Sequence, residues 1–250
     1  MTVSAPVAEK PNGLSTVVNT IAAPNEAFET LSRVPTWGWA CVIALILLLV
    51  GTFLQGPASR HAGVAMMQHA VTNSSIFANM SAEKKQEAVA NAGKPNASSY
   101  VVVAIMLFVA VFFNTLFMLI GNAIGRGQAD FKRLWCGSMN IAVPTLGLSA
   151  IALGLITTIR GADSFNSTSD LYAAVPGLGM LFHNGSPVLA AFFSAITVFS
   201  LWGWFLNATM LRVMAKTSAG VAYTMATIVL LLGAFVAAGF ASFARGMGFA

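Results

Sequence analysis

The residues best suited to chemistry lie in a short polar stretch between two apolar segments. Arg126, Asp130, Lys132 and Arg133 fall within eight positions of one another, and Arg212 and Lys216 precede the last apolar segment. Each Lys or Arg near an anionic membrane surface contributes about 1 kcal/mol to binding. These residues indicate contact with anionic lipid headgroups or with a cytosolic partner protein. The simpler interpretation is that they only fix the topology of a membrane protein.

No set of residues in the sequence predicts catalysis or a bound cofactor. We find no paired carboxylates or Ser/His/Asp set that would face a common site, and the three histidines lack the spacing of metal ligands. The stretch from Gly125 to Lys132 lacks the spacing of a phosphate-binding loop. The sequence therefore predicts a protein that is not an enzyme and binds no cofactor. The net charge of +5 indicates membrane topology and not nucleic-acid binding.

The composition is that of a membrane protein. Hydrophobic residues make up 57% of the chain and charged residues only 8%, and the mean hydropathy is +0.77. Soluble domains average about 25% charged residues. Five long segments lack Asp, Glu, Lys and Arg, and each exceeds the roughly 20 residues that cross a hydrocarbon core. Backbone groups in lipid must be satisfied within the segment, so helices are expected. We expect an all-α membrane protein with five spans, at about 37–54, 100–120, 141–158, 188–206 and 222–240.

The N-terminal region divides into two parts. Residues 1–22 are expected to form a disordered cytosolic tail, ahead of a membrane domain from 23 to 250. Pro24, Phe28 and Leu31 belong to a short amphipathic helix that Pro35 ends. Such a helix can lie in the membrane interface, and an ordinary helix packed on the bundle is the alternative.

Small residues and a proline indicate how the spans pack. Gly121 and Gly125 form a GxxxG motif, and Ala234 with Ala238 repeats the same spacing, which allows helices to approach closely and permits self-association. Pro144 interrupts the third span and is expected to kink it. The apolar segment 171–181 is too short and too rich in Gly and Pro to cross, so it is expected to dip into the outer interface.

The order of these features resembles the Yip1 domain family, particularly its bacterial members. The resemblance runs from about Pro24 to the C-terminus and rests on these motif residues: Pro24, Phe28, Leu31, Pro35, Trp37, Gly127, Phe131, Leu134, Pro144, the segment 171–181, Phe199, Trp202, Lys216 and Ser218. It implies a five-helix membrane protein with a cytosolic N-terminus. Eukaryotic members are linked to vesicle trafficking and associate with Rab GTPases. Thr197 stands where the family motif has an acidic residue, so the role of that carboxylate does not carry over.

Orientation and function follow as expectations. Basic residues beside span ends favour a cytosolic N-terminus and an outer C-terminus, in the bacterial inner membrane or, in a eukaryote, the Golgi or ER membrane. The first functional hypothesis is a membrane scaffold or adaptor with a basic cytosolic surface. The second is a small-solute transporter or channel, with Asn114, Asn122, Pro144 and the segment 171–181 around a cavity.

Overall fold

The computed structural model describes residues 12–181 and 186–246, and within these ranges the chain is helical, with one isolated β-bridge between Gly177 and Thr197. Four helical stretches there are long and apolar enough to cross a membrane: α3 (Gly38–Asn73), α5 (Ser98–Ile124), the continuous stretch Phe131–Arg160 and α11 (Ala219–Gly246). The all-helical membrane class expected from the composition is therefore what the structure has.

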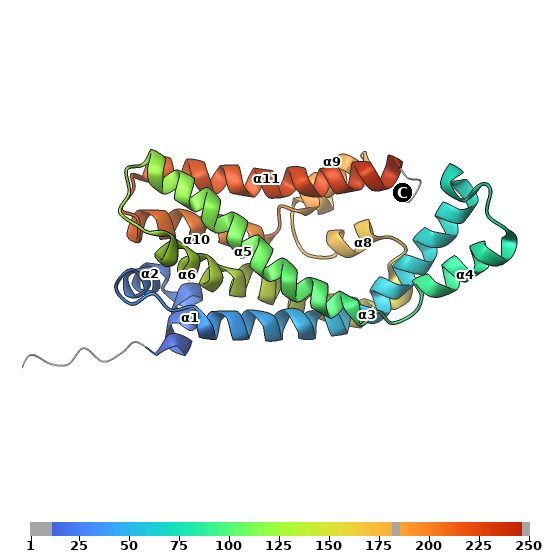
Figure 1. Ribbon diagram of the computed structural model, residues 1–250, viewed down its shortest axis with the longest axis horizontal. Coiled ribbons are helices and arrows are strands. Elements are labelled where there is room, and N and C mark those ends of the chain that lie inside the picture. The colour runs from blue at the N-terminus through green and yellow to red at the C-terminus, as the bar shows by residue number, and fades with distance from the viewer. Residues whose placement is uncertain (1–11, 182–185, 247–250) are drawn as a thin grey trace, which may run out of the picture.

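These long helices form an elongated bundle. Figure 1 shows α3 and α11 on opposite sides of the bundle, with α5 crossing obliquely between them. The main core cluster gathers α2 (Pro24–Arg33), α5, α6 (Phe131–Ala142), α10 (Val198–Val213) and α11 around fully buried side chains such as Leu134, Leu206 and Met210. On the other side, α3 packs against α7 (Ser149–Arg160).

The fourth expected span, 188–206, is not one helix. It is divided into α9 (Pro187–Ser194) and α10, with a break at residues 195–197. Thr197 caps α10, because its hydroxyl accepts a hydrogen bond from the Ser200 N–H at 3.2 Å and its own N–H donates to Ser200 Oγ at 2.8 Å. The prediction of a single uninterrupted helix here is wrong, because a capping box starts a new helix inside the apolar run.

The first expected span, 37–54, continues well beyond its predicted end. α3 has 36 residues and runs through Pro57, which gives a length of about 54 Å. It is followed by η1 (Ser75–Phe77) and α4 (Ala82–Ala92), whose N-cap is Ser81. The distal part of α3 and α4 project beyond one end of the bundle (Figure 1).

The third expected span, 141–158, lies within the stretch Phe131–Arg160. The interruption at Pro144 takes the form of η2 (Val143–Leu148), a π-helical segment between α6 and α7. Proline has no N–H to donate to the preceding turn, and a local π-helical adjustment can re-satisfy the backbone groups that it frees. The helix continues on both sides, so the proline widens one turn without ending the span.

The N-terminal region differs from the expected tail. Residues 13–22, placed in a disordered tail by the sequence, form α1 (Gly13–Ala22), capped by Asn12, whose side chain accepts from the Leu14 N–H. The part of that prediction that concerns residues 1–11 lies outside the described residues. In α2, Phe28 and Leu31 are fully buried in the main core cluster. α2 therefore packs on the bundle, and its location in the membrane interface stays a prediction.

Between α7 and α9 the described residues 161–181 form only short helical pieces. These are η3 (Ala162–Ser164), α8 (Thr168–Ala173) and η4 (Leu178–Leu181). The Leu178 N–H donates to the Ile196 carbonyl at 3.0 Å, and the Val198 N–H donates to the Pro176 carbonyl at 3.2 Å. The segment 171–181 is therefore hydrogen-bonded to the break between α9 and α10.

Candidate functional site

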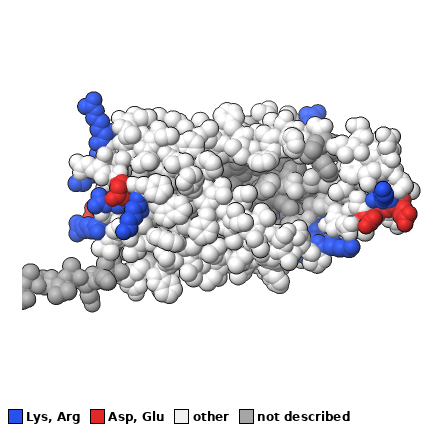
Figure 2. All heavy atoms as spheres, viewed as in Figure 1, with Lys and Arg blue, Asp and Glu red and all other residues white. Residues whose placement is uncertain are grey.

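The charged side chains gather at the two ends of the bundle. Figure 2 shows a largely uncharged middle on the visible face, with mostly Lys and Arg and a few acidic residues at one end and a second mixed group of charges at the other. The first end holds the α5–α6 turn, the α10–α11 turn and α2 (Figure 1). We call this the basic end and define it by Arg33, Arg126, Lys132, Arg133, Arg212 and Lys216. All six are exposed except Arg133, which is half-buried.

A backbone hydrogen bond joins the two turns of the basic end, because the Gln128 N–H donates to the Ala215 carbonyl at 2.9 Å. Within the first turn, the Gly127 N–H donates to the Asn122 carbonyl at 2.7 Å. In the second turn, both the backbone N–H and the hydroxyl of Thr217 donate to the Leu211 carbonyl at 3.2 Å. The turns that carry Arg126 and Lys216 are therefore held side by side.

The Asn122 side chain fastens the α5–α6 turn from inside. Its Nδ2 donates to the Ala129 carbonyl at 2.9 Å, and its Oδ1 accepts from the Ala129 N–H at 3.3 Å. Both residues are buried. A Cβ at Gly127 would clash with Asn122 Oδ1 and lie 2.7 Å from the Ala215 oxygen. The close fit thus needs glycine at this position.

Arg126 and Lys216 each adopt a left-handed backbone conformation, with φ of 51° and 56°. Residues other than glycine rarely do so, and such positions cost free energy that the surrounding structure must offset. Here the hydrogen bonds of the two turns supply that support. The hydrogen-bonded backbone of the two turns therefore fixes the positions from which the Arg126 and Lys216 side chains extend.

Asp130 has a local structural role at this end. Its Oδ1 accepts a hydrogen bond from the Arg133 N–H at 2.8 Å and so caps α6. The next residue, Phe131, is 42% exposed and stacks on Trp135, with ring centroids 6.1 Å apart. Tryptophan is enriched at membrane interfaces, and Trp135 lies here one helical turn from Phe131 and next to the basic end.

Acidic side chains also lie at this end: Glu26 and Glu29 on α2, and Asp130 at the start of α6. Within the described residues the one ion pair joins His61 and Asp163 at 3.6 Å, and it involves none of the six basic residues. Next to the two turns lies an apolar surface pocket of about 250 Å³. It is lined by Ile124 of α5 and by residues near the start of α11: Gly220, Val221, Thr224, Met225 and Ile228. Exposed cations thus adjoin an apolar surface.

The other motif residues are spread through the fold. Gly121 packs against Met225 and Gly125 against Thr217, so both glycines of the GxxxG motif make contacts inside the chain. Trp202 is 37% exposed on α10, and its ring lies 5.3 Å from that of Phe205. The helix that begins at Pro24 ends before Pro35, as expected.

A buried polar cluster lies deeper in the bundle. Asn114 Nδ2 donates to Ser138 Oγ at 2.9 Å and to Asn207 Oδ1 at 3.0 Å, which links α5, α6 and α10. Asn140 donates to the carbonyls of Cys136 and Thr36, while its buried Oδ1 has no hydrogen-bond partner. The sequence analysis singled out Asn114 but missed the other three side chains, which a search for polar residues in the charge-free segments would have found.

Within the described residues, no group of three or more His, Cys, Asp or Glu side chains could hold a metal ion. Comparison of the chain with protein-family models, with curated proteins and with solved structures finds no match.

Proposed function

We propose that the protein is a membrane scaffold or adaptor of the Yip1 type whose basic end binds anionic lipid headgroups. The observation that carries the proposal is a set of six basic residues without ion pairs, with Arg126 and Lys216 on turns hydrogen-bonded to each other. The adjacent apolar pocket favours a lipid over a soluble partner, because a lipid offers an acyl chain beside its headgroup. Clusters of Lys and Arg next to a membrane span commonly recognise anionic lipids.

The proposed topology has five crossings, with α9 and α10 acting together as the fourth. The eight residues of α9 and the sixteen of α10 correspond to about 12 and 24 Å of helix, against a hydrocarbon core of about 30 Å. This arrangement puts the basic end in the cytosol and the C-terminus outside, consistent with the positive-inside rule. The bacterial inner membrane suits the proposal best.

Charge reversal tests the lipid contact. We expect Lys132→Glu/Arg133→Glu to weaken binding of anionic lipid by about 2 kcal/mol or more, since each basic residue contributes about 1 kcal/mol. That corresponds to a roughly 30-fold lower affinity. The protein is purified from native membranes in mild detergent, and the retained anionic and neutral lipids are quantified by mass spectrometry.

The matched control is Lys84→Glu/Lys85→Glu, which makes the same change in charge on α4, at the other end of the molecule. This control is expected to retain anionic lipid as the wild type does. Equal retention by both double variants would overturn the proposal. Loss of a copurifying protein with unchanged lipid would identify a protein partner in place of the headgroups.

A small-solute transporter or channel is the second candidate. It is favoured by the break between α9 and α10, because non-helical backbone at membrane depth occurs where it is buried in protein or lines a cavity. The buried cluster of Asn114, Ser138 and Asn207 would supply polar groups along a path. We expect Asn114→Leu to abolish solute flux in proteoliposomes if this candidate is correct, and unchanged flux would count against it.

A further inference from the structure

α1 buries Val17 together with two threonines, while three other large apolar side chains of this helix are exposed. Thr16 and Thr20 are buried, at 3% and 0% exposure, whereas Leu14, Val18 and Ile21 are 46%, 57% and 36% exposed. The three exposed residues follow the i, i+4, i+7 spacing and so share one face. An exposed apolar stripe on an ordered helix requires an apolar environment to cover it.

The buried threonines satisfy their hydroxyls within the helix. Thr20 Oγ1 donates to the Thr16 carbonyl at 2.9 Å, and Thr16 Oγ1 donates to the Asn12 carbonyl at 3.3 Å. Ser15, which is exposed, and Asn19, which is half-buried, lie to one side of the apolar stripe. The outer surface of α1 is therefore apolar along one edge and polar along the other. This division suits a helix that lies in a membrane–water boundary.

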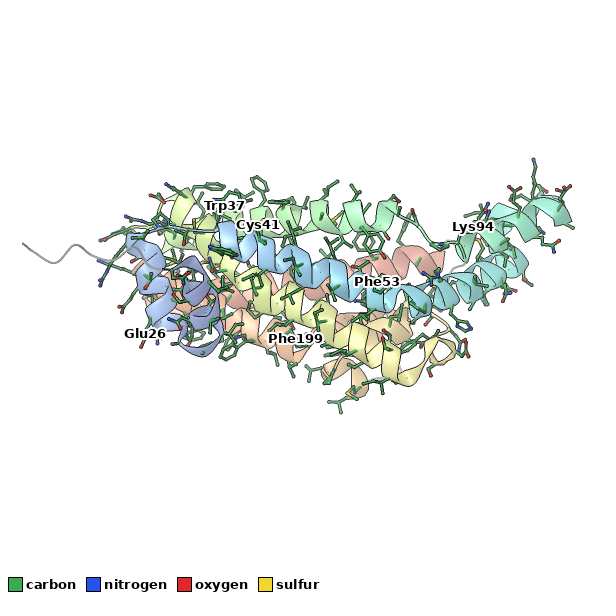
Figure 3. All side chains as sticks on the ribbon, turned by 90° about the horizontal axis from the view of Figure 1, so that it is seen from below. Glu26, Trp37, Cys41, Phe53, Lys94 and Phe199 are labelled. Carbon is green, nitrogen blue, oxygen red and sulfur yellow. The ribbon has the colours of Figure 1, made fainter. Side chains whose placement is uncertain are left out.

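The start of α1 adjoins the beginning of the first membrane helix. A Cβ at Gly13 would lie 2.7 Å from Trp39 Cδ1, so the start of α1 packs on that ring. Trp37 and Trp39 are 42% and 56% exposed. Tryptophans at the start of a span sit at headgroup level. Farther along, α3 exposes Ile46 and Phe53, and Figure 3 shows Trp37 and Phe53 at successive levels of the bundle.

We propose that α1 is embedded in the membrane interface, in the leaflet where α3 begins, with Leu14, Val18 and Ile21 among the acyl chains and Ser15 and Asn19 toward the headgroups. The occupant of the exposed stripe is lipid, because α1 packs on Trp39 at the start of α3, and α3 itself exposes apolar side chains along its length. The chain has no charged residue between Lys10 and Glu26. Insertion of α1 therefore depends on burial of apolar area and does not require anionic lipid, unlike the contact proposed for the basic end.

Environment-sensitive labels test this placement. An NBD fluorophore is attached to Val18→Cys or to Ser15→Cys in full-length protein with Cys41→Ala and Cys136→Ala, reconstituted into neutral phosphatidylcholine vesicles. Both labelled positions are exposed, so neither label displaces a core side chain. We expect doxyl-labelled lipid to quench the Val18 label several-fold more than the Ser15 label, and aqueous iodide to show the reverse order.

Two outcomes would overturn the proposal. Equal quenching at the two positions would show that α1 does not lie in the membrane interface with its Leu14, Val18 and Ile21 face toward the acyl chains. No protection of the Val18 label in the neutral vesicles, with protection in a second set that contains anionic lipid, would show that charge, and not apolar burial, holds the helix there. Because the first set of vesicles is neutral, failure of the anionic-lipid proposal for the basic end leaves this test unaffected.

Discussion

Gly51→Leu is expected to lower the free energy of unfolding by about 3 kcal/mol or more, because the new side chain would force apart two helices whose backbones touch. A Cβ at Gly51 would lie 2.5 Å from the carbonyl carbon and 2.6 Å from the oxygen of Ala150 on α7. These are backbone atoms, which cannot rotate aside as a flexible side chain can. The α3–α7 contact would therefore have to open. SDS titration of the protein in detergent micelles, followed by circular dichroism, measures the change.

Gly233→Leu is the matched control. Gly233 also lies inside a long apolar helix, α11, but nothing lies within 4 Å of a Cβ added there. Replacing a helix-interior glycine with leucine improves helix propensity by up to about 1 kcal/mol. This variant is expected to be at least as stable as the wild type. An equal loss of stability in both variants would contradict the close approach of α3 and α7.

Gly51 also illustrates what one sequence can reveal about helix packing. The spacing of Gly121 and Gly125 suggested close packing, and both glycines do pack closely, against Met225 and Thr217. Gly51 has no small residue four positions away, at Leu47 or Gln55, so the motif does not mark it. Its partner is a small residue on another helix about 100 positions distant, and only the fold brings the two together.

The charge-free segments predicted that the chain is helical and where most of its long apolar helices lie, because the absence of charge directly reflects an apolar environment. Helix ends were predicted less well where contacts between distant segments decide them. α3 continues past Pro57 because Ala58 and Ala62 are buried in a cluster with Phe165. The break after Ser194 is stabilised by backbone bonds to Pro176 and Leu178. Neither contact can be predicted from the hydropathy of the local sequence.

The sequence predicted which charged residues make up the candidate site, but not the hydrogen bonds that hold its two turns. The sequence grouped Arg126 with Lys216 because both flank spans, and the structure brings their turns together. It gave no indication that Asp130 caps α6 or that Asn122 fastens the turn. An asparagine at the end of an apolar segment can form hydrogen bonds with many different groups. Which group it contacts depends on the path that the following residues take.

That role of Asn122 leads to the second large effect. Asn122→Leu is expected to lower the free energy of unfolding by about 2–4 kcal/mol, because it leaves the buried N–H and carbonyl of Ala129 without their hydrogen-bond partners. Leucine has the same number and branching of side-chain heavy atoms as asparagine, so the substitution removes the hydrogen bonds without leaving a cavity. SDS titration in micelles measures the stability.

The same variant connects the architecture of the turn to its proposed use. All six cations of the basic end remain in Asn122→Leu, so any drop in retained anionic lipid must come from their displacement when the turn loosens. We expect a several-fold drop, smaller than that of Lys132→Glu/Arg133→Glu. Asn25→Leu, the same exchange at an exposed position of α2, should change neither stability nor lipid retention. If Asn122→Leu lost stability but retained lipid fully, headgroup binding would depend on the number of charges near the membrane and not on the paired turns that hold Arg126 and Lys216.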